Sequence, residues 1–133
     1  MVNYAVSLIE NHFHSLENRN ILILGLSFRE NVKEVTKSST LLLIDELKKK
    51  GVDVYVDDPQ FSDQEIASFN VKPFKEKDAK DMDAIILQAF HDEYKKLKFE
   101  QFTNCKYVLD GRNKLDKQQI EKLGIVYRGI GKK

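Results

Sequence analysis

Short apolar runs alternate with amphipathic segments along most of this chain, and this alternation constrains the fold more than any other feature. Strands are predicted for the apolar runs at residues 21–26, 53–57, 84–87, 107–109 and 125–127, with a weaker edge strand at 71–74. Helices are predicted between them, at residues 40–50, 62–69, 76–80, 92–102 and 117–123. Strands that alternate with helices form a parallel sheet covered on both faces. We therefore expect a Rossmann-like, doubly wound α/β domain, in three α/β/α layers around five or six strands.

A further helix is predicted before this unit, over residues 2–17. Its apolar residues recur at intervals of four and three and form one stripe: Val2, Val6, Ile9, Phe13 and Leu16. Two interpretations are open, a flanking helix packed on the domain or the end of a longer helix leading from another domain. We favour the second, which divides the chain into an N-terminal helix at 1–18 and a domain at 20–133. Such a stripe can also drive self-association, so a homodimer is possible.

Composition excludes several classes of protein. A chain of 133 residues with a net charge of +1 has the size of one domain and lacks the charge of a nucleic-acid-coating protein. No apolar window is long enough for a membrane span, and the N-terminus has no signal pattern. The single cysteine suits a reducing compartment, so we expect a cytoplasmic protein.

The first strand and the helix after it are joined by a polar loop that suits a phosphate-bearing ligand. The strand ends at Gly25, the loop carries Phe28 and Arg29, and Ser38 opens the helix. Backbone N–H groups at a helix start and a nearby cation favour anions. The loop lacks the Gly-x-Gly-x-x-Gly of dinucleotide sites, since Ser27 stands where the second glycine is required.

A second arginine is expected at the same edge of the sheet. Arg112 follows the strand at 107–109, and the guanidinium fork of arginine suits a phosphate or a base carbonyl. Gly111 before it indicates either a close backbone approach or a turn with positive φ. Two arginines at one rim favour a diphosphate.

Other polar residues do not form a catalytic or metal-binding pattern. Cys105 is interpreted as a small buried residue rather than a nucleophile, and the three histidines have no metal-ligand spacing. His91 is interpreted as a capping or surface histidine, with a place at the ligand rim as the alternative. The acids Asp57 and Asp58 are read as turn and cap residues, and neither they nor the pair Asp81 and Asp83 have an evident partner for acid–base work.

Four short stretches in order resemble one known family. They are Gly-Leu-Ser-Phe-Arg at 25–29, Tyr-Val-Asp-Asp-Pro at 55–59, His-Asp-Glu-Tyr at 91–94 and Asp-Gly-Arg-Asn at 110–113. Together they resemble the C-terminal, UDP-binding domain of the UDP-glucose/GDP-mannose dehydrogenase family, over about residues 20–131. The chain departs from the family pattern at Thr36, Lys37 and Ser39, where arginine, glutamate and proline are usual.

The resemblance implies part of an NAD-dependent nucleotide-sugar 6-dehydrogenase, of the UDP-glucose, UDP-N-acetylmannosamine or GDP-mannose type, an oxidoreductase of polysaccharide biosynthesis. Such enzymes oxidise the sugar C6 alcohol to a carboxylate. NAD and the catalytic cysteine would belong to N-terminal NAD-binding and central helical domains that this chain lacks, so the chain would bind a UDP- or GDP-sugar without cofactor or turnover. The alternative is a stand-alone nucleotide-binding module with a regulatory or oligomerisation role. The resemblance places these residues at the substrate: Phe28, Arg29, Ser38, Gly111, Arg112 and Asn113.

Overall fold

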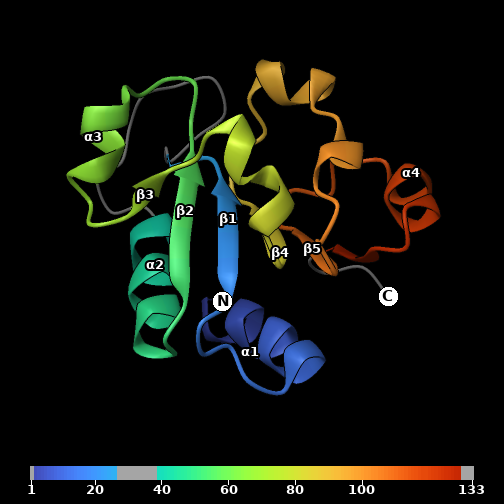
Figure 1. Cartoon of the computed structure of the whole chain (residues 1–133), viewed down its shortest axis with the longest axis horizontal. Helices are drawn as coiled ribbons and strands as arrows, with labels where there is room; N and C mark the ends of the chain where they lie inside the picture. The colour runs from blue at the N-terminus through green and yellow to red at the C-terminus, as the bar shows by residue number, and fades with distance from the viewer. Residues whose placement is uncertain (1, 27–38, 130–133) are drawn as a thin grey trace.

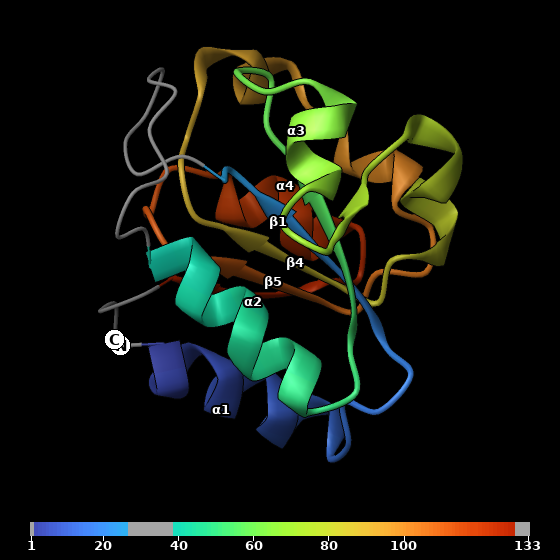
Figure 2. The same cartoon turned by 90° about the vertical axis from the view of Figure 1, so that its left-hand side faces the viewer.

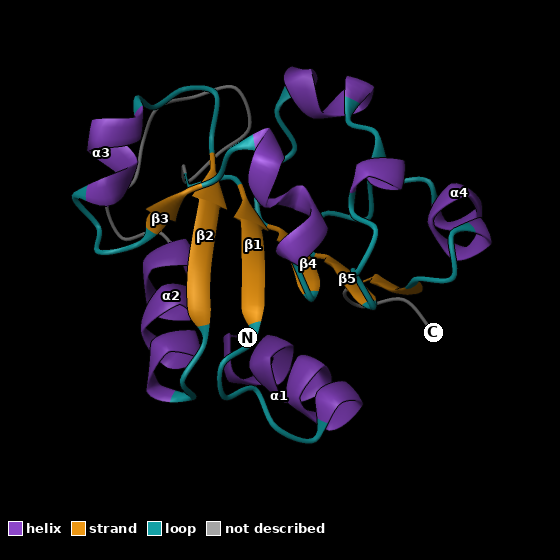
Figure 3. Cartoon of the chain, viewed as in Figure 1, coloured by secondary structure: helices purple, strands orange, loops and turns teal. Residues whose placement is uncertain are grey.

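The computed structural model describes residues 2–26 and 39–129, which form a six-stranded sheet in which all neighbours are parallel (Figures 1 and 3). The order across the sheet is β3-β2-β1-β4-β5-β6. The strands are β1 (Asn20–Leu24), β2 (Asp53–Asp57), β3 (Lys72–Pro73), β4 (Ala84–Leu87), β5 (Tyr107–Asp110) and β6 (Val126–Gly129). The predicted fold class and the short edge strand at Pro73 are both confirmed.

The centre of the sheet is the most apolar part of the chain. All four residues of β4 are buried, as are residues 21–24 of β1. Strands β1 and β4 are neighbours, with Leu24 opposite Leu87 at their carboxyl ends. Because β2 and β3 lie on one side of β1 and β5 and β6 lie beyond β4, the order reverses between β1 and β4. Open α/β sheets bind ligands beside the carboxyl ends of the strands at such a reversal.

One face of the sheet is covered by α1 (Val2–Phe13) and α2 (Ser39–Lys49), which lie side by side, and by the short α3 (Asp63–Ala67) (Figure 2). Helix α3 begins with a capping box formed by Ser62 and Glu65. The core on this face combines helix side chains with every second strand residue: Ile9, Leu16, Ile21, Ile23, Leu43, Leu47, Val54, Val56 and Ile86.

The N-terminal helix is packed into this core rather than standing apart from it. Val6, Ile9 and Leu16 are almost fully buried, so the apolar stripe is used within the chain. The Tyr4 hydroxyl also accepts a hydrogen bond from Arg128 of β6 at 3.2 Å. The helix ends at Phe13 rather than at residue 17, because His14 adopts a left-handed backbone with φ of 67° and the chain turns there.

The other face is covered by short helices: η1 (Glu76–Asp81), η2 (Asp92–Lys96), η3 (Phe99–Gln101) and α4 (Lys117–Lys122). The predicted single helix at 92–102 is wrong, because Leu97 and Lys98 are extended and divide it into two 3-10 turns. Tyr94, Phe99 and Phe102 are nevertheless all buried on this face. Among the described helices, none combines the length and apolar content needed to cross a bilayer.

Candidate functional site

The carboxyl ends of β1, β2 and β4 are tied together by backbone hydrogen bonds. The Gly25 N–H donates to the Asp57 carbonyl at 2.8 Å, and the Gln88 N–H donates to the Leu24 carbonyl at 2.8 Å. Gly25 has φ of +101°, and a Cβ there would lie 2.5 Å from the Ala89 nitrogen. Glycine is therefore required at this position both by its backbone conformation and by the neighbouring chain.

The loop after β5 is organised by the buried carboxylate of Asp110. This side chain accepts hydrogen bonds from the Arg112 N–H at 3.0 Å, the Leu115 N–H at 2.8 Å and the Tyr127 hydroxyl at 2.7 Å. Burial raises the pKa of Tyr127, and its hydrogen bond to Asp110 raises it further. The first residue of the Asp-Gly-Arg-Asn stretch thus acts as the internal support of the loop.

Gly111 allows this loop to approach β4 closely. Its N–H donates to the Leu87 carbonyl at 3.0 Å, and a Cβ on Gly111 would lie 2.5 Å from that oxygen. Of the two explanations for this glycine, close approach is the one observed, because Gly111 is not among the residues with positive φ. The left-handed position is instead Asn113, with φ of 57°.

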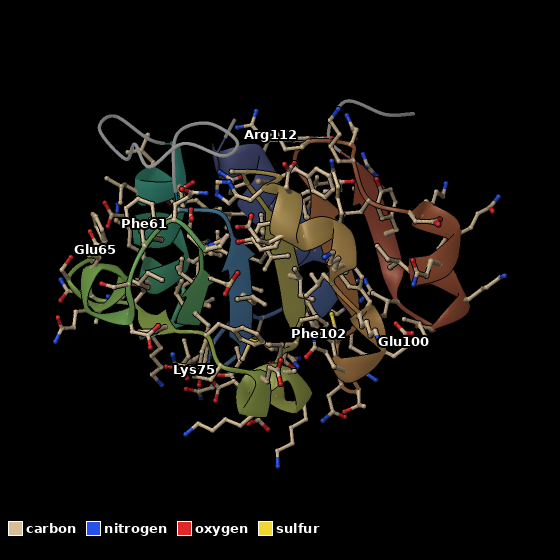
Figure 4. The ribbon with its side chains drawn as sticks, turned by 90° about the horizontal axis from the view of Figure 1, so that it is seen from above. Phe61, Glu65, Lys75, Glu100, Phe102 and Arg112 are labelled. Atoms are coloured by element: carbon tan, nitrogen blue, oxygen red, sulfur yellow. The ribbon has the colours of Figure 1, made fainter. Side chains whose placement is uncertain are left out.

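Arg112 lies exposed at the rim and is anchored to the reversal point of the sheet. Its Nε donates to the Gln88 carbonyl, one residue beyond β4, at 2.7 Å. The remaining guanidinium nitrogens can face a ligand in a fixed orientation. Figure 4 looks down on the sheet and places Arg112 on the side of α1 and α2, opposite Lys75 and Phe102.

The side chains of Gln88 and Thr40 lie between the anchored arginine and the start of α2. The Gln88 Nε2 is 3.5 Å from the Thr40 Oγ1, and the Thr40 hydroxyl is 3.4 Å from the Gly25 carbonyl. Sequence reasoning missed Gln88. Its only signal was its place directly after a predicted buried strand. The predicted site residues Phe28, Arg29 and Ser38 lie outside the described residues.

A buried histidine–aspartate pair supports the same edge. His91 and Asp58 have side chains with no exposed surface, and the His91 Nε2 lies 3.0 Å from an Asp58 carboxylate oxygen. His91 occupies the N-cap position of η2, as predicted, but caps it without a side-chain hydrogen bond, and the prediction of a surface position is wrong because the residue is buried. Asp58 thus has a titratable partner that the sequence did not reveal, and Asp83 pairs with Arg19 at 3.6 Å, a contact that supplies no acid–base partner. These partners are distant in sequence, so no local pattern could reveal them.

A cavity of about 410 Å³ lies on the other face, at the end of β2. The Tyr94 hydroxyl donates to the Asp57 carbonyl at 2.7 Å beside it, and burial raises the pKa of the Asp57 carboxyl. The described lining carries the carboxylates of Asp57, Glu76 and Glu93 and the ammonium of Lys75. Because three carboxylates and one ammonium line this cavity, its charge is unfavourable for the negatively charged diphosphate of a dinucleotide.

The remaining chemical groups of the described region serve packing. Burial raises the pKa of the Cys105 thiol to about 12, so it is protonated near neutral pH and is a poor nucleophile. No group of three or more His, Cys, Asp or Glu residues in residues 2–26 and 39–129 could hold a metal ion. The described edge of the sheet offers an arginine held by a hydrogen bond and close backbone contacts that glycine allows. These features suit the binding of a ligand.

Comparison with known proteins agrees with this geometry. The model of the UDP-glucose/GDP-mannose dehydrogenase family, UDP binding domain, matches residues 22–117. An uncharacterised protein of Methanocaldococcus jannaschii is 30% identical over 142 residues, covering 93% of this chain and 16% of its own length. The UDP-glucose 6-dehydrogenase of Drosophila melanogaster is 23% identical over 151 residues, covering 98% of this chain and 32% of that enzyme.

A solved structure extends the likeness to three dimensions. A UDP-glucose dehydrogenase from the archaeon Pyrobaculum islandicum superposes with a TM-score of 0.76 at 25% identity, over 96% of this chain and 29% of that one. The chain therefore spans about a third or less of the length of the relatives it matches. The family model covers most of the chain, including the ends of β1, β2, β4 and β5, and we conclude that the chain belongs to the UDP-glucose/GDP-mannose dehydrogenase family, as its UDP-binding domain.

Proposed function

We propose that this chain binds the diphosphate and base of a UDP- or GDP-sugar, as part of an NAD-dependent nucleotide-sugar 6-dehydrogenase. The observation that carries the proposal is the anchoring of Arg112 at the point where the strand order reverses. Its contact with the Gln88 carbonyl uses Nε, so the two terminal nitrogens can donate further hydrogen bonds. A planar, permanently charged group held in this way can form paired hydrogen bonds with a phosphate.

Several further residues support binding at this rim. Gly111 and Asn113 give the loop its close approach and its turn, and Asp110 supports it from below. Phe28, Arg29 and Ser38 are proposed to complete the pocket, as the family resemblance implies. The substrate is then held by residues from the connections after β1 and β5.

NAD is not proposed as a ligand of this chain. The cavity beside Asp57, where a dinucleotide-binding fold places its ribose-binding acid, is lined by three carboxylates. We propose that NAD and the catalytic cysteine belong to domains outside this chain, and that the chain alone does not oxidise a sugar. In the complete enzyme, the role of these residues would be to hold the nucleotide end of the substrate in place.

Calorimetric titration tests the proposal. We expect saturable binding of UDP and UDP-glucose or of GDP, no binding of NAD, and a loss of about 10- to 100-fold in affinity for Arg112→Ala, the usual cost of a charge-assisted hydrogen bond. Arg19→Ala is the matched control, because it removes an arginine that precedes β1 at the opposite edge of the sheet. Binding of no nucleotide, or equal losses in the two variants, would contradict the proposal.

A further inference from the structure

We propose that the buried Asp58–His91 pair is a positioning element of the nucleotide site: it fixes the strand ends that carry the site, and ligand affinity depends on it. The inference rests on the proposed function. The pair itself lies under the rim, and its two side chains have no exposed surface.

One carboxylate connects three segments. An Asp58 oxygen, Oδ2, accepts the Leu26 N–H at 2.8 Å and lies 3.0 Å from the His91 Nε2, while Oδ1 accepts the Gln60 N–H at 2.8 Å. An ionised carboxylate only accepts, so Nε2 carries the hydrogen in this contact. Asp58 thereby joins the chain after β1, its own turn after β2, and the chain after β4.

The contact continues from His91 to the arginine of the site. His91 lies three residues after Gln88, whose carbonyl holds the Arg112 Nε at 2.7 Å. The short segment 88–91 is therefore fixed at one end by Arg112 and at the other by Asp58. If the Asp58 side chain no longer makes these contacts, segment 88–91 and the Leu26 N–H are no longer held by the same carboxylate.

Stability alone does not explain a fully buried pair of this kind. Removing a carboxylate and an imidazole from water is costly, and apolar residues of similar volume are often as stable. Hydrogen bonds are directional, unlike apolar contacts, so those of the pair fix the positions of three chain segments relative to one another. A ligand site at this edge of the sheet requires such fixed positions.

The opposite end of β1 provides a natural comparison. There Asp83 accepts the Asn20 N–H at 2.8 Å and pairs with Arg19 at 3.6 Å. The two aspartates thus make the same kind of bond to backbone N–H groups at opposite ends of one strand. The Asp83 side chain is 26% exposed and lies away from the proposed site, whereas Asp58 is fully buried beneath it.

The test compares Asp58→Asn with Asp83→Asn, and His91→Leu with His91→Gln, in the full chain. Glutamine can place a neutral N–H donor near the position of Nε2, whereas leucine cannot. Affinity for UDP is measured by calorimetry, and amide hydrogen exchange reports the Leu26 and Asn20 N–H bonds. We expect Asp58→Asn and His91→Leu to weaken UDP binding by about tenfold or more, and Asp83→Asn and His91→Gln by less than about threefold.

The exchange measurement separates positioning from general loosening. We expect faster exchange at Leu26 in Asp58→Asn and His91→Leu, and at Asn20 in Asp83→Asn. UDP binding by the wild type that is unchanged in folded Asp58→Asn or His91→Leu would overturn this inference and leave the proposed function standing. If Asp58→Asn does not fold, the two His91 variants decide the matter, and equal affinities for them would overturn it. If the wild type binds GDP instead of UDP, the same variants are compared with GDP, and absence of binding of both nucleotides would overturn the proposed function and this inference with it.

Discussion

Gly111 illustrates how a single residue decides whether the arginine loop can reach the sheet. The loop approaches β4 so closely that a methyl group at Gly111 would lie 2.5 Å from the Leu87 carbonyl oxygen. That oxygen belongs to the rigid centre of the sheet and already accepts the Gly111 N–H. The loop would therefore have to move, and Arg112 would move with it.

For this reason Gly111→Ala is expected to reduce both stability and nucleotide affinity. Forcing extra atoms into packed surroundings typically costs about 1–3 kcal/mol, and we expect a loss of that size in the free energy of unfolding by urea. Asn113→Gly is the matched control in the same loop, because glycine adopts the φ of 57° without strain. Equal stability of Gly111→Ala and wild type would show that the close approach is not required.

At the scale of elements, the N-terminal helix behaves as part of the domain core. Ile9 has no exposed surface and packs with residues of β1 and α2. The proposed division at residue 18 concerns the architecture of a larger protein and stays a prediction. The helix packs against α2 and β5, and its buried residues share one apolar cluster with residues of β1 and β4.

We therefore expect Ile9→Ala to destabilise the domain by about 2–5 kcal/mol, the usual cost of truncating a buried isoleucine. Asn11→Ala, at an exposed position of the same helix, should change the free energy of unfolding by less than about 0.5 kcal/mol. The measurement is urea denaturation followed by circular dichroism. A small effect of Ile9→Ala would mean that α1 is dispensable for the fold.

The sequence predicted the strands better than the helices, for a physical reason. The fully apolar run at 84–87 has no alternative but a buried strand, and it appears with the predicted bounds. The segment at 92–102 has a helical composition, yet Leu97 and Lys98 are extended and divide it. The contacts of this segment with the sheet are tertiary and are not visible in a local pattern.

The site was predictable in part. Gly111 was predicted to make a close approach or to have a positive φ, and it makes the close approach, whereas the positive φ belongs to Asn113, for which the sequence predicted none. The Asp58–His91 pair was not predictable, because 33 positions separate the partners and only the parallel sheet brings them together. Gln88 carries its anchoring role through its backbone carbonyl, which its side chain does not indicate.

At the scale of the whole molecule, the two faces of the sheet differ in chemistry. In the described part of the chain, the face under α1 and α2 is mostly aliphatic and buries one weak acid, Tyr107, whereas the face under the short helices carries three: Tyr94, Cys105 and the partly exposed Tyr127. Burial raises the pKa of each of these groups, that of Cys105 to about 12. Each of them is therefore held protonated by folding, and the face under the short helices carries more of these alkali-sensitive groups.

This asymmetry predicts alkaline destabilisation that begins with Cys105. Its reference pKa is 9.0 and its folded pKa is about 12, so above pH 9 the unfolded state binds fewer protons than the native state. Stability from this group is complete below pH 9 and is lost as pH rises toward 12, at up to about 1 kcal/mol per pH unit. The tyrosines add to the slope above their reference value of 10.0.

Urea denaturation at pH 7, 9 and 10 measures this slope, and Cys105→Ala provides the comparison. The variant is expected to be less stable at pH 7, because a buried side chain is truncated, yet to lose less free energy of unfolding between pH 9 and 10 than the wild type. Its slope should rejoin that of the wild type only above about pH 12, where the thiol is ionised in both the folded and the unfolded states. Equal slopes in the two proteins between pH 9 and 10 would show that the thiol is not held protonated by the fold, and the alkali-sensitive face would then begin at its tyrosines.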